Sequence, residues 1–182
     1  MAEALQRIEY DATVDDAVDV SLRFARRTRT FRNQIRYAIL IVGALTGIAA
    51  LAVAIYAAPP DTSRGYLVLL ALAAAFGVVT ALIFRGFFAK EIRKQQRKMV
   101  AEQFGGKPAI RSEVELRPEA VWVRQAGMEM LFPWDACTSV IDNPGDIEIN
   151  FTPGICVVRD RHFASAADRQ SFLETSRRLS GK

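Results

Sequence analysis

Two long apolar runs dominate the pattern of hydrophobic and polar positions along the chain. They extend over residues 37–58 and 66–84, and the seven residues from Pro59 to Gly65 connect them. A helix of about 20 apolar residues crosses the hydrocarbon core of a bilayer. Because the connection is too short to hold a domain, the pattern predicts an antiparallel transmembrane hairpin.

Helical periodicity extends beyond the hairpin on both sides. Thr13 resembles an N-cap, with Asp16 three residues further on, and the apolar positions after it predict an amphipathic helix to about Phe31. A short strand, Ile8 to Tyr10, is expected before it. After the second run, residues 85–103 continue as a basic helix until the glycines at 105 and 106 and Pro108 interrupt it.

Past these glycines the hydrophobic period changes from that of a helix to that of a strand. Five or six short antiparallel strands are expected near residues 114–116, 121–123, 128–132, 138–141, 147–151 and 155–158. Turn residues separate them at 118–119, 125–127, 143–146 and 152–154. A final helix follows from Ser165 to Leu179. The predicted fold class is a transmembrane two-helix hairpin followed by a cytoplasmic α+β domain, an antiparallel barrel or sheet capped by a helix.

This pattern divides the chain into four parts. Residues 1–34 form a cytoplasmic strand and amphipathic helix, and residues 35–85 form the hairpin with spans 37–58 and 66–84. Residues 86–106 are a basic juxtamembrane helix and linker, and residues 107–182 are the cytoplasmic domain.

The formal charge of +4 is distributed unevenly. Residues 23–36 contain six arginines and no acid, and residues 85–98 contain six basic residues and only Glu91. From Met99 onward there are 10 basic and 12 acidic residues, a net charge of −2, which argues against nucleic-acid binding. Basic residues near a span stay on the cytoplasmic side. We therefore expect a multi-pass protein of the inner (cell) membrane with both termini in the cytoplasm and an uncleaved first span.

The basic flanks have two possible roles. They fix the topology, or they also bind anionic lipid head groups. The candidate lipid contacts are Arg26, Arg27, Arg29, Arg32, Arg93, Lys94, Arg97 and Lys98.

Small residues at a four-residue spacing mark both spans. Gly43 and Gly47 form a GxxxG pattern in the first, and Gly77 is the matching candidate for helix packing in the second. They serve either packing within the hairpin or a homodimer. Only Thr46 and Thr80 are polar in the middle of the spans, so the hairpin is expected to be an anchor, and a small oligomeric channel is the last alternative.

Groups that could carry catalysis are sparse. Cys137 and Cys156 form no CxxC pair, and His162 is the single histidine. A dyad of His162 with Cys156 or Asp160 lacks an orienting group and an oxyanion site. The sequence thus predicts no enzymatic activity, metal, cofactor or small-molecule substrate.

Three arginines close to the final helix form a second candidate site. Arg159, Arg161 and Arg169 could bind phosphate, although the neighbouring Asp160 and Asp168 favour a salt-bridged surface.

Short motifs in the last third carry a resemblance to a known family. They are residues 131–135 (LFPWD), the strand 155–159, residues 161–163 (RHF) and Ser165 before the last helix, together with residues 8–10 at the start. In these motifs the chain resembles the YcxB-like family of small bacterial membrane proteins. The resemblance implies two spans and a cytoplasmic domain similar to a pleckstrin-homology-like β-barrel closed by a helix, without any established enzymatic activity.

Trp134 and Phe163 are the aromatic residues that these motifs single out. They line a peptide or lipid groove, or they are core residues that close the domain against the last helix. The expected function is a non-enzymatic membrane protein that presents an interaction domain to a protein partner or to its own copies. The alternatives are a sensor of anionic membrane lipids and the channel.

Overall fold

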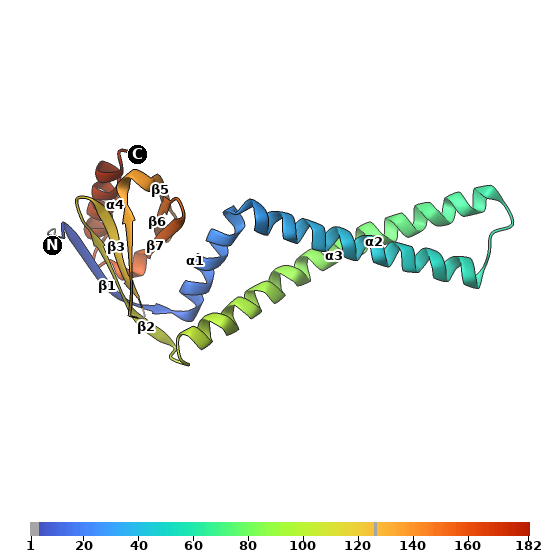
Figure 1. Ribbon diagram of the computed structural model, residues 1–182, viewed down its shortest axis with the longest axis horizontal. Coiled ribbons are helices and arrows are strands. Elements are labelled where there is room, and N and C mark those ends of the chain that lie inside the picture. Colours follow the sequence, from blue (N-terminus) through green and yellow to red (C-terminus); the bar gives the residue numbers. More distant parts are fainter. Residues whose placement is uncertain (1–3, 126) are drawn as a thin grey trace. The chain divides into compact units, whose positions relative to one another are not determined.

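The computed structural model describes residues 4–125 and 127–182, and the chain divides into two compact units (Figure 1). The first, here called the sheet unit, combines Met1–Phe24 with Arg97–Lys182. The second, here called the hairpin unit, is Ala25–Gln96. The predicted turn at residues 125–127 includes Ala126, which lies outside the described residues.

The hairpin unit consists of two long antiparallel helices. Helix α2 extends over Arg29–Ala57 and helix α3 over Ser63–Gln103. Both are long and apolar enough to cross a membrane. The two predicted spans lie in these helices, apart from Ala58, which caps α2. The predicted basic continuation of the second span is confirmed, because α3 runs without a break to Gln103.

Glycines bring α2 and α3 into close backbone contact. A Cβ added to Gly77 would lie 2.5 Å from the carbonyl oxygen of Gly43, and one added to Gly47 would lie 3.1 Å from the carbonyl oxygen of Ala73. Small residues allow helix backbones in a membrane to approach in this way. The three predicted packing glycines therefore serve the contact within the hairpin, and a homodimer through the same residues stays a prediction.

Replacing Gly77 with alanine is expected to destabilise the hairpin by about 1–3 kcal/mol, since the new methyl group meets backbone that cannot move aside. Gly86→Ala is the matched control in the same helix, because a Cβ at Gly86 meets no atom within 4 Å. Thermal unfolding in detergent should separate the two variants. Equal melting temperatures would contradict the close contact.

The sheet unit contains two antiparallel sheets. Strands β1 (Gln6–Thr13), β2 (Ala109–Leu116), β3 (Ala120–Gln125) and β4 (Met128–Pro133) form the first, in the order β1-β2-β3-β4. Strands β5 (Cys137–Asn143), β6 (Asp146–Phe151) and β7 (Gly154–Arg159) form the second, in the order β5-β6-β7. Among the described strands no ladder joins the two sheets, so the expected barrel does not close.

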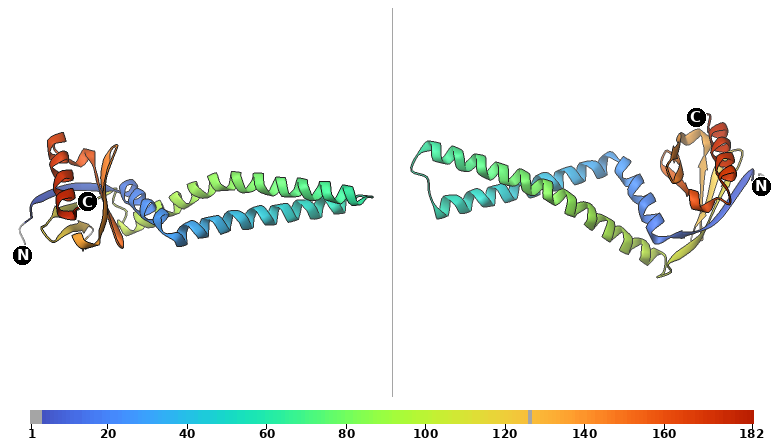
Figure 2. Two further views of the ribbon diagram at one scale, coloured as in Figure 1. Left: turned by 90° about the horizontal axis from the view of Figure 1, so that it is seen from above. Right: turned by 180° about the vertical axis from the view of Figure 1, so that it is seen from behind.

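Short helical elements complete the sheet unit. A 3₁₀ turn, η1 (Trp134–Ala136), links the sheets, and another, η2 (Asp160–His162), follows β7. The final helix α4 (Ala166–Ser180) lies against β5 and η1 (Figure 2). Ser165 caps it as predicted, because its hydroxyl accepts a hydrogen bond from the Asp168 amide.

Strand β1 pairs with β2 over its whole length, from Gln6 opposite Leu116 to Thr13 opposite Ala109. The N-terminal strand is thus part of the same sheet as β2, and the predicted part 107–182 contains neither this edge strand nor the helix after it. The whole hairpin unit lies in sequence between two adjacent, paired strands. Local periodicity carries no signal for a pairing between segments so distant in the chain.

Helix α1 (Val14–Arg27) follows β1 and is shorter than predicted. Its start is confirmed by a reciprocal cap, in which the Asp16 amide donates to the Thr13 hydroxyl and the Thr13 amide donates to the Asp16 carboxylate. The expected end near Phe31 is wrong. Thr28 begins a new helix, α2, and its hydroxyl accepts a hydrogen bond from the Phe31 amide.

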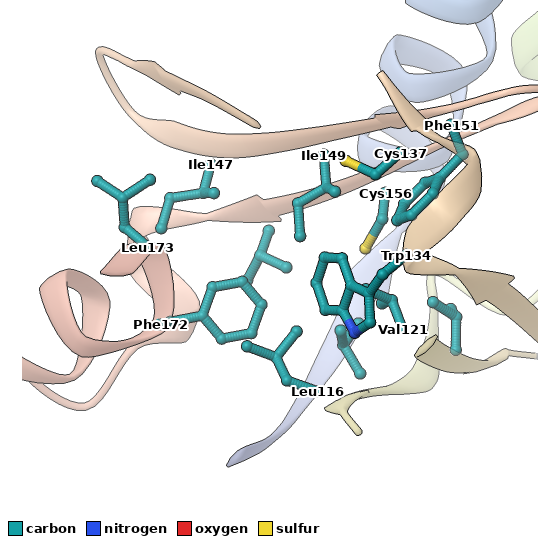
Figure 3. Packing of buried hydrophobic residues seen from close by; sticks show 13 residues of the cluster. Leu116, Val121, Trp134, Cys137, Ile147, Ile149, Phe151, Cys156, Phe172 and Leu173 are labelled. Carbon is teal, nitrogen blue, oxygen red and sulfur yellow. The ribbon is translucent and has the colours of Figure 1, made fainter. Parts of the chain in front are cut away.

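The hydrophobic core lies between the two sheets and α4 (Figure 3). The Trp134 indole is 6% exposed and lies among Leu116, Val121 and Phe172. Its Nε1 donates a hydrogen bond to the Arg117 carbonyl at 2.8 Å, so the polar end of the ring is satisfied. Phe163 is partly buried and meets Phe172 edge-on, with the ring centroids 5.5 Å apart.

Candidate binding cavity

A cavity of about 380 Å³ opens in the sheet unit beside the core. Residues of β1, β3 and β4 line it from the first sheet, β7 and η2 line it from the second, and α1 lines the remaining side. This is the size of a small ligand site. Segments from both ends of the chain form it, because β1 and α1 precede the hairpin and the other elements follow it.

Alternation along β1 directs Tyr10 and Ala12 to this cavity, whereas Glu9 and Asp11 are exposed. The cap at Thr13 then turns the chain into α1, which adds Ala17, Val20 and Phe24 to the wall at helical spacing. The local sequence thus builds an apolar wall from one face of a strand and one face of the next helix.

The second sheet contributes a wall of similar character. Ile155 and Val157 of β7 face the cavity, and Met130 of β4 joins them from the first sheet. At the beginning of β7 the Phe132 ring lies so close to Gly154 that a Cβ at this position would overlap it. The ring also stacks on Phe151, with the centroids 5.0 Å apart. Phe132 therefore closes the cavity at this end.

A stacked pair of rings lies at the other end. The ring centroids of Tyr10 and His162 are 4.1 Å apart, with an angle of 20° between the planes. Burial lowers the pKa of His162, and the nearby Arg161 lowers it further. Burial likewise raises the pKa of Tyr10. Both rings are therefore uncharged at neutral pH.

His162 presents an unsatisfied polar atom at this site. Its Nε2 is buried and has no hydrogen-bond partner among the described residues. The residue lines the cavity. Buried polar atoms in proteins are usually hydrogen-bonded, so an unpartnered nitrogen on a residue of the cavity wall is unusual.

Cys156 also borders the cavity but is poorly suited to nucleophilic chemistry. It is 6% exposed, and its sulfur points into the core near Trp134 (Figure 3). Burial raises its pKa to about 12, so the reactive thiolate is scarce at neutral pH. The dyad of His162 with Cys156 therefore lacks an activated nucleophile.

An ion-pair network fastens α1 to the second sheet beside the cavity. Arg23 donates to both carboxylate oxygens of Asp146, at 3.0 and 2.7 Å, and to Glu148 at 3.2 Å. Both acids are buried, with 1% and 4% exposure. Paired hydrogen bonds of this kind fix the relative orientation of the two side chains in addition to bringing their opposite charges together. The network holds α1 over β6 and thereby keeps the α1 wall of the cavity in place.

A second part of the network joins α1 to the end of β7. Arg159 contacts Asp16, Asp19 and Asp146, and Arg161 contacts Asp16. Arg169 pairs separately with Asp142 and Asp160. All three arginines considered for phosphate binding are therefore engaged by acids, which supports the salt-bridged interpretation.

The network gives the sheet unit a predicted pH dependence. Burial raises the pKa of Asp146, but hydrogen bonds from Arg23 and Asn143 outweigh it, and the pKa lies below its usual value. A carboxylate with a lowered pKa stabilises the fold above its unfolded pKa of ~3.9 and loses that contribution as the pH falls through the folded value. Urea unfolding should show stability falling below about pH 4. Asp146→Asn should flatten this slope, and an unchanged slope would contradict the role of Asp146.

Trp134, Phe163 and the basic candidates for lipid contact lie outside this cavity, whereas Cys156, Arg159 and His162 line it. Trp134 is in the core, and Phe163 packs against it. The eight basic candidates for lipid contact are exposed. The Nε of Arg97 lies 3.4 Å from the Oδ1 of Asp15. Sequence reasoning missed the cavity. The available signal was the alternation of Tyr10 and Ala12 together with the apolar face of α1, but nothing in the sequence places these opposite β7.

Comparisons of the chain with family models, with curated proteins and with solved structures find no match. The resemblance to the YcxB-like family therefore stays a prediction.

Proposed function

We propose that this protein is a non-enzymatic membrane protein that presents a binding domain at the cytoplasmic face of the inner membrane. The observation that carries the proposal is the position of the hairpin in the chain. The two apolar helices connect β1 to β2, which are adjacent strands of one sheet. The domain is thus attached to its anchor through two neighbouring strands.

The side chains of the hairpin support a membrane location. Large apolar residues are exposed along both helices, including Leu40, Ile48, Leu72 and Leu82. A helix that is apolar all round needs an apolar surrounding. The hydroxyl of Thr46 donates to the Val42 carbonyl within its own helix at 2.8 Å, so this mid-span group is satisfied internally.

The pairing of β1 with β2 also supports the expected topology. Two spans return the chain to the side from which it left, and the sheet requires this because one of its strands precedes the hairpin and the others follow it. The basic residues at 23–36 and 85–98 favour the cytoplasm as that side.

The seven strands in two antiparallel sheets, with a helix at the C-terminus, support a pleckstrin-homology-like binding domain. The cavity is the surface best suited to the partner, because it combines apolar walls with an unsatisfied nitrogen.

Photo-crosslinking in cells tests this function. A photoreactive residue at Met130, which lines the cavity, should give discrete products with a partner. The same residue at Arg178, which is exposed on α4, is the control and should not give them. Identical products from both positions, or none from either, would contradict a partner-binding role for the cavity.

A second candidate function is the recognition of anionic lipids by the basic segments. The exposure of all eight basic candidates favours it, and each charge near the surface could add ~1 kcal/mol. Replacing Arg93 and Lys94 with glutamine should then reduce retention on anionic vesicles at low salt, while high salt should abolish the difference. Retention that salt does not change would argue against this function.

A further inference from the structure

We propose that the outer edge of β7 binds an extended, uncharged and apolar segment of a partner protein, which pairs with β7 as an additional strand in the cavity. This inference rests on the proposed function, because it specifies how the cavity recognises a partner. Addition of a strand to a free sheet edge is a general mode of peptide recognition, in which main-chain hydrogen bonds supply affinity and pockets supply specificity.

Strand β7 lies at the edge of its sheet. Among the described strands, β7 pairs with β6 only and ends the sheet β5-β6-β7. The Asp160 amide donates to the Gly145 carbonyl at 3.0 Å, immediately after the paired residues Asp146 and Arg159. Because the direction of main-chain groups alternates along an antiparallel strand, those of Ile155, Val157 and Arg159 point away from β6.

All three of these residues line the cavity. Their outward N–H and C=O groups form an edge of donors and acceptors beside apolar walls, where unpaired main-chain groups are costly. Val157 is only 8% exposed. An incoming strand would satisfy such groups in the alternating pattern of a sheet ladder.

The other sheet edges differ from β7 in their charge, their cover or their exposure. Strand β1 carries charged residues on its exposed face, among them Arg7 and Glu9, and charges of this kind discourage strand addition. Helix α4 contacts β5. Strand β4 is an exposed edge, with Leu131 56% exposed, so it is the alternative that the experiment must separate from β7.

The free edge of β7 is long enough to pair with a short extended segment. From Ile155 to Arg159 the strand provides about 13 Å of edge at ~3.3 Å per residue. Across the cavity, α1 offers Ala17, Val20 and Phe24 as an apolar wall. His162, whose Nε2 is buried and has no partner among the described residues, lines the cavity as well.

The charges of the cavity wall determine which side chains the bound segment can carry. The charged residues that line the cavity are Asp16 and Arg159, and they face each other with an N–O distance of 3.5 Å. Arg161 also contacts Asp16, and Asp19 and Asp146 contact Arg159. Each lining charge is thus already compensated, and a charged side chain in the cavity would have no counter-charge. Apolar, uncharged side chains complement these walls.

The experiment uses the full-length protein in lipid nanodiscs and a displayed library of random peptides as the probe. Enriched peptides should share a stretch of uncharged residues with apolar side chains at alternate positions. Val157→Pro removes one outward N–H without removing a bond to β6, and should weaken binding of a chosen peptide about tenfold or more. Leu131→Pro, an exposed position on the β4 edge, is the matched control and should leave the affinity unchanged.

A second variant and a hydrogen-exchange measurement distinguish a loss of peptide binding from a folding defect. Val20→Trp fills the cavity from α1 without altering β7, and should also abolish binding. Hydrogen exchange should show that the bound peptide protects the amides of Ile155 and Val157. The inference is overturned if no peptide is enriched, if Val157→Pro binds like the unaltered protein, or if Leu131→Pro is the variant that loses binding. If crosslinking at Met130 still captures a partner in those cases, only this inference fails and the proposed function stands.

Discussion

Replacing Trp134 with alanine is expected to lower the free energy of unfolding of the sheet unit by ~3–5 kcal/mol. The indole is 6% exposed and belongs to the core cluster that contains Leu116, Val121 and Phe172. Its removal leaves a large space between the sheets and α4. It also leaves the Arg117 carbonyl without the Nε1 donor that lies 2.8 Å away. These losses together are a large fraction of the stability of a small domain.

Native-state hydrogen exchange of the β6 amides in the full-length protein measures this loss, because these amides exchange only when the sheet opens. Trp122→Ala is the matched control. Its ring lies only partly buried on β3, with the Arg117 guanidinium 4.8 Å from the centroid, and its loss should cost roughly 1 kcal/mol. If Trp134→Ala left exchange unchanged, Trp134 would not be a core residue and a role in binding would have to be reconsidered.

Replacing Arg23 with glutamine is expected to destabilise the sheet unit by about 3 kcal/mol. Arg23 is the residue of α1 that bonds both oxygens of Asp146. The carboxylate is buried, and removing its partner leaves a charge in a poorly solvated position. Arg159 and Asn143 still contact Asp146, which keeps the loss below the cost of a wholly unpaired charge. The same substitution should release α1 from the second sheet.

Arg26→Gln is the control for this prediction, because Arg26 is exposed near the end of the same helix. Exchange of the α1 amides should increase in Arg23→Gln and remain unchanged in Arg26→Gln. Adding Asp146→Asn to Arg23→Gln removes the buried charge that has lost its Arg23 partner and should restore part of the stability. Equal protection of α1 in both single variants would show that the ion pairs do not hold the helix.

Local patterns predicted most of the elements. The two apolar runs gave the hairpin, and the alternating segments gave strands at each of the six positions expected after residue 107. Thr13 and Ser165 were correct helix caps because capping depends on neighbours within a single turn. Each of these features depends on residues that are close together in the chain, so the local sequence is sufficient to predict it.

The features that escaped prediction depend on segments that are distant in the chain. Ile8 to Tyr10 was predicted as a short strand without a named partner, and the structure pairs it with β2, which follows the hairpin in the chain. Arg23 was counted among the basic flank, although buried acids on β6 bind it. The cavity was missed for the same reason, because its walls come from α1 and β7. The periodicity of hydrophobic positions does not indicate which distant segments pack together.

The proposed function requires the hairpin to cross the membrane between two strands of one cytoplasmic domain. Labelling of single cysteines with a membrane-impermeant maleimide tests it directly, since Cys137 and Cys156 are buried in the folded protein. Ser63→Cys reports on the loop and Glu119→Cys on the sheet unit, and both positions are exposed. Ser63→Cys should react in intact cells from which any outer membrane has been stripped, and Glu119→Cys should react only after lysis. Labelling of Glu119→Cys in intact cells, or protection of Ser63→Cys there, would contradict this topology.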